Sequence, residues 1–442
     1  MVVSLFLRIF EVEPDFEAIN RGLLFQQFIE ILLNKLRPAD PEMRSFDFAH
    51  KVRLLAMLAR RMSDENRYSL HETDWNDFLE QYFQSLGMRK PDRITEDFID
   101  SGVLVKAGGE LFFRFRVFEE YFCAQAMMED PAFKKRVLDS YLSFANEIDF
   151  FTGLKRNTLD VLEYLGGILQ QAREQFPDVD IRHLDKIEID QVLVRIMQET
   201  GPKQEDKQDI IQRKDAIVDT IEEPPVRQTD AKPKPHVKSA WLRFFLTLTL
   251  YARVLRNCEF LPADQKSLAL QTTVLDSCTL LAVFFREAEN IVNTADDSVK
   301  DALRYFVGVW VPLLVQTALT QSVGNPKLEY QLKALIESAS TDFVRFMALS
   351  VYSDLELPNH LQKFKEFLSR LENPCLQEIC LYKLLFYYHS RTNASRPTLT
   401  YVEEIIADLG AKLHKYRPKE RGKYMQSLRK GWLNRRFVEG EQ

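Results

Sequence analysis

The chain has 442 residues, a formal net charge of −6 and a pI near 5.8. This acidic balance argues against a general affinity for nucleic acid, although it leaves room for a local basic patch. Hydrophobic residues at 45% and charged residues at 28% are typical of a soluble globular protein, and the length predicts roughly two to four domains. Because the chain has only 15 glycines beside many residues that favour helices, we expect a mainly α fold.

The spacing of cysteines and histidines predicts neither a disulfide framework nor a metal site. None of the five cysteines forms a C-x-x-C pair, and the seven histidines show no H-E-x-x-H spacing. The N-terminus turns acidic too soon for a signal peptide. The uncharged stretch from Tyr305 to Asn325 is interrupted by polar residues, so we expect a buried core helix there and no membrane partner. The chain is predicted to be cytoplasmic.

Residues 1–70 predict a helical domain. Helices are expected over residues 21–35 and 48–62, after an apolar helical segment at residues 1–10. In the first of these helices, Leu24, Phe28 and Leu32 recur at steps of four residues and define one apolar face.

Residues 71–128 predict a winged-helix-like domain with one small β-hairpin. The expected elements are helices over Trp75–Leu86 and Thr95–Asp100, strands over Val103–Lys106 and Glu110–Arg114, and a last helix that ends near Met128. Gly108-Gly109 between the strands is a favoured hairpin turn. In the last helix, the spacing predicts that Phe115, Phe118 and Phe122 lie on one face. A hairpin attached to a helical bundle is the alternative that the same pattern allows.

Residues 129–442 are expected to form three further parts. Residues 129–200 are expected to form a helical connector, and residues 201–239, with five prolines and few large apolar residues, a flexible linker or insertion. A helix over Asp209–Ile221 is the one helical candidate inside that linker. Residues 240–442 predict an all-helical domain with helices over about 241–256, 264–290, 297–322, 326–352, 358–370, 374–389 and 398–414. Such helices can stack as a solenoid, although no clean repeat period is present.

A cluster of basic residues follows the last of these helices. It is interleaved with aromatic residues, and it includes Lys415, Arg417, Arg421, Lys423, Arg429 and Lys430. This composition is that of an anion- or nucleic-acid-binding patch. A solvated terminal helix is the alternative, because clustered charge alone is an unspecific signal.

Catalytic motifs are absent from the sequence. It has no G-x-x-x-x-G-K-[ST] phosphate loop, no G-x-G-x-x-G and no G-x-S-x-G elbow. Neighbouring acids such as Glu119 and Glu120 lie on predicted helices, where paired carboxylates usually form solvated faces. We therefore expect no enzyme activity and no cofactor in this chain alone.

Two segments carry a family resemblance. The first has Asn20, Arg21, Leu24, Phe25, Phe28, Ile29 and Leu32 in the pattern N-R-x-x-L-[YF]-x-x-F-[IV]-x-x-L. The second has Phe113, Phe118, Glu120, Tyr121, Phe122 and Ala124 in a pattern similar to F-x-H-x-x-F-x-E-Y-[FL]-x-A. With the helices and strands between them, residues 1–128 resemble the part that follows the nucleotide-binding core in NACHT-type STAND NTPases, the signal-transducing P-loop ATPases. The later segment NEIDFFTGLKR resembles bacterial members more loosely.

The chain departs from this family pattern in two respects. The family's histidine, which the resemblance implies would contact a nucleotide phosphate, corresponds to Phe115, and a phenylalanine cannot donate a hydrogen bond. The P-loop ATPase core would lie before Met1. The resemblance thus implies the C-terminal part of such a protein: a helical domain, a winged helix and a helical sensor region.

The implied function is that of a regulatory and sensor portion of a STAND NTPase, in signal transduction or bacterial antiphage defence. Its expected partners are proteins: the missing NTPase core, a trigger molecule or another copy of the chain. One alternative is a stand-alone helical scaffold that binds proteins. The other is a nucleic-acid binder that uses the winged helix and the basic C-terminus.

Overall fold

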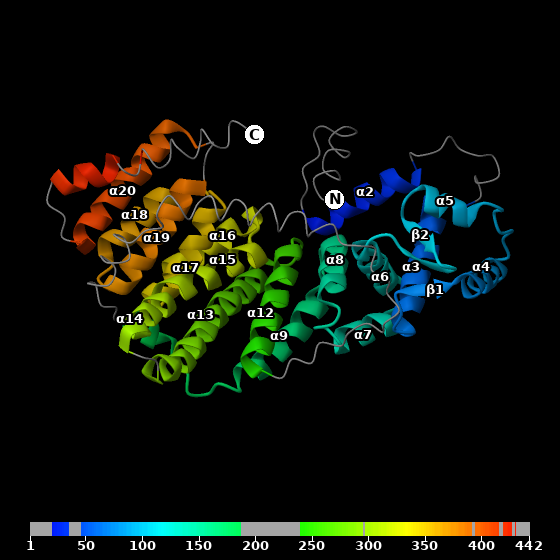
Figure 1. The fold of residues 1–442 in the computed structure, drawn as a ribbon, viewed down its shortest axis with the longest axis horizontal. Coiled ribbons are helices and arrows are strands. Elements are labelled where there is room, and N and C mark those ends of the chain that lie inside the picture. The colour runs from blue at the N-terminus through cyan, green and yellow to red at the C-terminus, as the bar shows by residue number, and fades with distance from the viewer. Residues whose placement is uncertain are drawn as a thin grey trace. The chain divides into compact units, whose positions relative to one another are not determined.

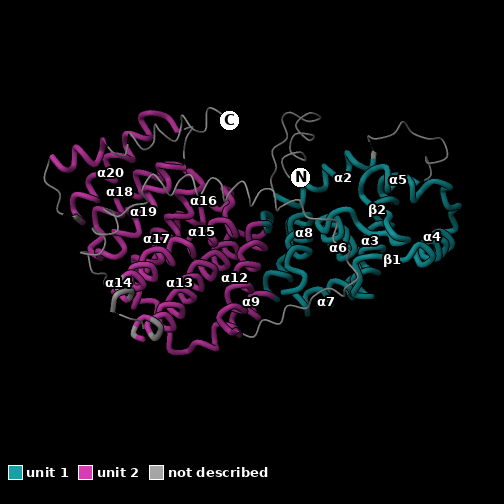
Figure 2. The backbone as a smooth tube through the Cα atoms, in the orientation of Figure 1, with its two compact units in different colours: residues 1–164, 223–237, 257–260 teal, residues 165–222, 238–256, 261–442 magenta. Residues whose placement is uncertain are grey.

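The computed structural model describes residues 20–34, 46–186, 239–294, 297–390, 394–414, 419–426 and 429. The predicted helical segment at 1–10 and residues 201–238 of the predicted linker lie outside this part of the chain. The chain divides into two compact units (Figure 2). The first unit extends to Tyr164 and also includes Asn257–Phe260, and the second unit begins at Leu165.

The first unit is helical with one small sheet. Its elements are α2 (Arg21–Asn34), α3 (Phe48–Asp64), β1 (Ser69–His71), α4 (Glu72–Leu86), α5 (Ile94–Asp100), β2 (Leu104–Ala107), β3 (Glu110–Phe113), α6 (Arg116–Glu129), α7 (Pro131–Asp139) and α8 (Ala145–Lys155) (Figure 1). Helix α9 (Leu159–Arg173) carries the chain into the second unit. The prediction of a mainly α fold with a hairpin is confirmed.

The sheet has three antiparallel strands in the order β1-β3-β2, so the predicted two-stranded hairpin was incomplete. Strand β1 pairs Leu70 with Leu111, whereas β2 pairs Leu104 with Phe113. The predicted turn is present, and Gly108 and Gly109 adopt φ values of 63° and 81°, which suit glycine. The sequence did not indicate β1 because three residues are too short to show alternation.

Helix α6 is the centre of the first unit. It is buried on nearly all sides, through Phe118, Glu119, Glu120, Tyr121, Phe122, Cys123, Ala124, Ala126 and Met127. It packs along α3, where the Cys123 thiol donates to the carbonyl of Ala59 over 3.6 Å. A helix buried all round is typical of a domain core, so the segment that carries the second motif holds this unit together.

The second unit is helical throughout its described part. Its elements are η2 (Ile181–Lys186), α12 (Ala240–Asn257), α13 (Ala263–Thr294), α14 (Asp297–Tyr305), the π-helical turn η3 (Phe306–Trp310), α15 (Val311–Val323), η4 (Pro326–Leu328), α16 (Glu329–Ser338), α17 (Asp342–Asp354), α18 (His360–Arg370), α19 (Pro374–Ser390) and α20 (Arg396–His414). The single helix predicted over 326–352 is divided, because Thr341 caps a new helix by accepting from the Val344 amide. Buried α17 lies at the centre of this unit.

Two helical stretches of the described residues are long and apolar enough to cross a membrane. They are Ala263–Glu289 and Ala302–Val323, with 61% and 44% of their most apolar windows buried inside the protein. The sequence had drawn attention only to the second stretch. Core helices of soluble proteins meet the same criterion, so it is weak evidence of a membrane span.

Candidate functional site at the junction of α2, α6 and α8

The two motif segments of the sequence meet in the first unit, and the segment NEIDFFTGLKR joins them. Asn20 precedes α2 and caps it, because its side-chain oxygen accepts from the amide of Leu23 over 2.9 Å. Its side-chain nitrogen donates to the carbonyl of Gly153, in α8, also over 2.9 Å. One asparagine therefore begins α2 and attaches it to α8.

The start of α2 lies directly against the backbone of α8. A Cβ on Gly22 would be 3.1 Å from both the carbonyl carbon of Gly153 and the amide nitrogen of Leu154. A Cβ on Gly153 would be 3.0 Å from the Asn20 side-chain oxygen. The approach of the two helices thus depends on two glycines that the sequence had not singled out.

Glu120 is the polar centre of the junction. It is 5% exposed, and its carboxylate accepts from the Asn146 side-chain nitrogen of α8 over 3.0 Å. It also pairs with Arg116 over 3.5 Å and with Arg21 over 3.7 Å. The Arg21 guanidinium lies 4.5 Å from the centre of the Phe150 ring. Glu120 therefore links all three helices, where the sequence had predicted a solvated acidic pair.

An aromatic cluster lies beneath these polar contacts. The Phe25 ring is 5.4–5.8 Å, centroid to centroid, from the rings of Phe28, Phe118, Tyr121 and Phe150. Burial raises the pKa of Tyr121 well above its usual range, and its hydroxyl accepts from the Gln125 side chain over 2.8 Å. The cluster is therefore neutral and apolar.

The remaining motif residues pack inside the unit. Leu24 and Phe28 are buried on α2, and Ala124 is buried on α6. The rings of Phe113 and Phe122 stack at 5.6 Å and attach β3 to α6. These residues stabilise the fold, and their side chains have no polar group that could bind a ligand.

Phe115 lies at the edge of the junction. It is the N-cap residue of α6, in extended conformation and without a side-chain cap bond, and it is 39% exposed. Its ring meets Phe118 edge-on at 5.5 Å. The prediction of one face shared with Phe118 and Phe122 was thus only partly right, because Phe115 precedes the helix while the other two are buried.

Another part of α8 makes contacts that the sequence did not indicate. The Asn257 side-chain nitrogen lies within hydrogen-bond reach of the Asp149 carboxylate, the Asp149 carbonyl and the Thr152 hydroxyl, at 2.8–3.0 Å. Arg156 pairs with the buried carboxylate of Glu259 over 2.5 Å. These contacts fasten Asn257–Phe260 to the first unit, and their sequence separation of about a hundred residues gave no local signal.

The predicted basic patch is described only in part. Lys415, Arg417 and Lys430 lie outside the described residues, and Lys423 lies in a helical segment over 419–426. Two acids of α20 neutralise its arginines: Arg421 pairs with Asp408 over 2.6 Å and Arg429 with Glu403 over 2.7 Å. Anion binding here stays a prediction, with less free positive charge than the sequence had indicated.

The described residues include no cluster of three or more metal-ligating side chains. The five cysteines are all buried, and burial raises the pKa of Cys258 and, to about 12, that of Cys375. Such thiols are protonated and unreactive near neutral pH. The junction of α2, α6 and α8 therefore consists of packing and ion pairs.

Comparison with known proteins gives a family match over a short part of the chain. The family described as Novel STAND NTPase 4 matches residues 68–123, from the residue before β1 into α6. No curated protein and no solved structure matches the chain significantly. The match supports a relationship of this chain to STAND NTPases, and it ends within the motif that contains Glu120.

Replacing Glu120 tests the junction directly. We expect Glu120→Ala to lower the free energy of unfolding of the first unit by about 2 kcal/mol, because hydrogen bonds to a buried carboxylate contribute about 1.5–3 kcal/mol. Glu129→Ala is the matched control on the same helix, since Glu129 is half exposed and pairs with Arg53 at the surface. Urea unfolding followed by circular dichroism measures both, and equal losses would contradict the role of Glu120.

Proposed function

We propose that this chain is the regulatory and sensor portion of a NACHT-type STAND NTPase and acts in cytoplasmic signal transduction, with antiphage defence as its setting. The observation that carries the proposal is the meeting of the two motif segments through Asn20, Arg21 and Glu120. The family match to residues 68–123 supports the same class of protein independently.

We further propose that residues 71–128 form a winged helix, to which α3 and β1 before them also contribute. The chain runs α3, β1, α4, α5, β2 and β3, and β1 adds to the hairpin on the β3 side. This order of helices and strands is the observation that supports the assignment, and the family match covers β1 to β3 entirely.

In this proposal the chain regulates an ATPase core but does not hydrolyse nucleotide itself. Phe115 stands exposed at the start of α6, where the family pattern has histidine. Its ring offers an apolar contact and no hydrogen bond to phosphate. In this proposal the inactive state of the NTPase is therefore stabilised by packing of this chain against the ATPase core and by the junction around Glu120. Phe115 makes no direct contact with a nucleotide phosphate.

Sequencing of the DNA upstream of Met1 and affinity purification of the tagged chain together test the proposal. We expect an in-frame phosphate loop upstream of Met1, or recovery of a P-loop NTPase with the tagged chain from its native cells. Phe115→Ala should reduce that recovery several-fold, because the exposed ring would lose its apolar contact. Tyr164→Ala is the matched control, since Tyr164 is 38% exposed in the same unit and Phe115 is 39% exposed. Absence of both the upstream loop and the NTPase partner would reject the proposal.

A stand-alone protein-binding scaffold is the second candidate, and the second unit offers one observation in its favour. The Trp310 ring lies 5.8 Å from that of Phe386, which is 50% exposed, and Phe306 and Leu314 nearby in sequence are 49% and 59% exposed. Exposed apolar side chains of this kind are typical of protein-interaction surfaces. Recovery of a partner without a phosphate loop, lost on Phe386→Ala, would favour this candidate.

A further inference from the structure

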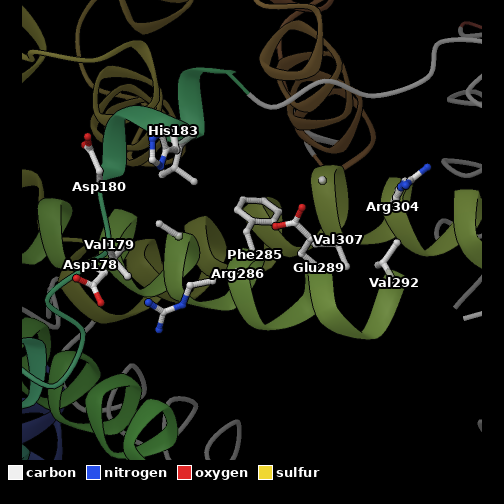
Figure 3. Close-up of a pocket in the computed structure, with 13 residues that line it drawn as sticks. Asp178, Val179, Asp180, His183, Phe285, Arg286, Glu289, Val292, Arg304 and Val307 are labelled. Carbon is white, nitrogen blue, oxygen red and sulfur yellow. The ribbon is translucent and has the colours of Figure 1, made fainter. Parts of the chain in front are cut away.

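The second unit contains a pocket that none of the motifs explains. Its volume is about 420 Å³, and it lies between the segment that leads into η2 and the helices α13, α14 and η3 (Figure 3). This volume is within the range of about 300–1,000 Å³ that small-molecule sites occupy.

The η2 wall of the pocket is fixed in place. The Asp185 carboxylate accepts from the backbone amides of Asp342 and Phe343, over 3.1 and 2.9 Å, and so caps α17 from a distant part of the chain. The Asp185 carbonyl accepts from the Asn373 side chain over 2.5 Å. Leu184, the residue before it, is 2% exposed and belongs to the pocket lining. The pocket is thus preformed on this side.

Most of the pocket lining is apolar. Val179, Leu184, Ala282, Phe285, Val292 and Val307 contribute to it, and Gly308 belongs to the π-helical turn η3. Such single π-turns occur frequently at functional sites, because they change the direction of a helix face locally. The lining therefore favours a ligand with an apolar or aromatic body.

The charges at the pocket favour a cation. Glu289 and Asp178 line it and have no ion-pair or hydrogen-bond partner among the described residues. Arg286 is already paired with Glu287 over 3.6 Å, and Asp180 with Arg182 over 2.7 Å. Arg304, the other cation of the lining, also has an interaction of its own within the chain. Glu289 and Asp178 are therefore the lining charges that have no partner among the described residues.

The position of Glu289 decides where that cation would sit. Phe285 and Glu289 are four residues apart on α13, so their side chains lie on one face of that helix, and both line the pocket. In Figure 3 the side chain of Arg304 extends away from the Phe285 ring. A carboxylate next to an aromatic face offers a cation both an ion pair and a cation–π contact. Glu289 and Phe285 together can bind an ammonium group.

We propose that this pocket binds a small organic amine, with its ammonium group on Glu289 and its apolar body between Phe285, Leu184 and Val307. The inference does not depend on the NTPase proposal, since it concerns binding alone. It assigns the second unit a chemical specificity that the sequence motifs did not indicate.

Calorimetric titration of the full chain with three phenyl compounds of similar size and different charge tests the proposal. They are 2-phenylethylamine, the neutral 2-phenylethanol and the anionic 3-phenylpropionate, and the titrations are made at about pH 8. We expect the amine to bind about tenfold more tightly than either of the others, which corresponds to one charge-assisted contact. Equal affinity for the amine and the anion, or no binding of the amine, would overturn the proposal.

Two variants locate the binding. Glu289→Gln and Phe285→Ala should each weaken binding of 2-phenylethylamine about tenfold, because each removes one of the two contacts with the ammonium. Glu337→Gln is the matched control, since it removes an exposed carboxylate of the same unit outside the pocket. Glu289 is itself exposed, so its substitution leaves the fold intact, and unchanged amine affinity in Glu289→Gln would refute the assignment.

Discussion

Phe118→Ala should lower the free energy of unfolding of the first unit by about 3–5 kcal/mol, the range for removing a buried aromatic ring. Phe118 is 1% exposed, and its ring lies 5.8 Å from that of Phe25 and 6.2 Å from that of Phe28. Truncation would leave a cavity between α2 and α6 that neither helix can close. The decrease in unfolding free energy should be larger than that for Glu120→Ala, because Phe118→Ala removes a large buried apolar surface as well as the contacts of the ring.

Hydrogen exchange measured by mass spectrometry checks this prediction within one unit. Peptides from α2 and α6 should lose protection in Phe118→Ala, whereas peptides from α17 should keep it. Phe115→Ala is the matched control on the same segment, since the Phe115 ring is 39% exposed. Its removal should lower the free energy of unfolding by less than about 1 kcal/mol. Equal effects of the two substitutions would show that α6 does not depend on the buried cluster.

Local patterns predicted most of the helices and the hairpin. The steps of four residues in α2 and the Gly108-Gly109 turn are short-range signals, and both match the structure. Strand β1 was missed because it pairs with β3 far along the chain and is only three residues long. The break before α17 was missed because its cap, Thr341, lies within a run that is otherwise compatible with one helix.

The junction could be predicted only in part, because contacts between segments that are far apart in the sequence leave no local pattern. The motif residues Asn20, Arg21 and Glu120 were recognised as separate patterns, and the sequence did not show that they contact one another. Asn146 and Gly153 complete the junction from α8, and neither has a local signal of that role. The same limit applies to the basic tail, where composition cannot show that Glu403 neutralises Arg429.

Glu378 is a buried carboxyl group whose ionisation should weaken the second unit. It is 3% exposed on α19, and its carboxyl oxygen lies 3.5 Å from the Tyr305 hydroxyl. Burial raises the pKa of Glu378 from 4.5 to about 7, and the hydrogen bond from Tyr305 opposes this shift only in part. The neutral acid is therefore the form that the folded unit favours.

The sign of the pH dependence follows from this raised pKa. Between about pH 4.5 and pH 7 the folded unit holds a proton on Glu378 that the unfolded chain has released, so stability falls as pH rises. The contribution is fully present below the unfolded pKa and is lost above about pH 7. At 1.36 kcal/mol per pKa unit, the total change is about 3 kcal/mol.

Glu378→Gln should therefore stabilise the second unit by up to about 3 kcal/mol at pH 8 and leave its stability nearly unchanged at pH 4. An amide retains the shape of the side chain and can still accept from Tyr305, but it has no charge to desolvate. Urea unfolding of both proteins across this pH range measures the difference, and Glu372→Gln, at an exposed position, is the control. A difference that is constant with pH would show that Glu378 does not ionise in the folded protein over this range.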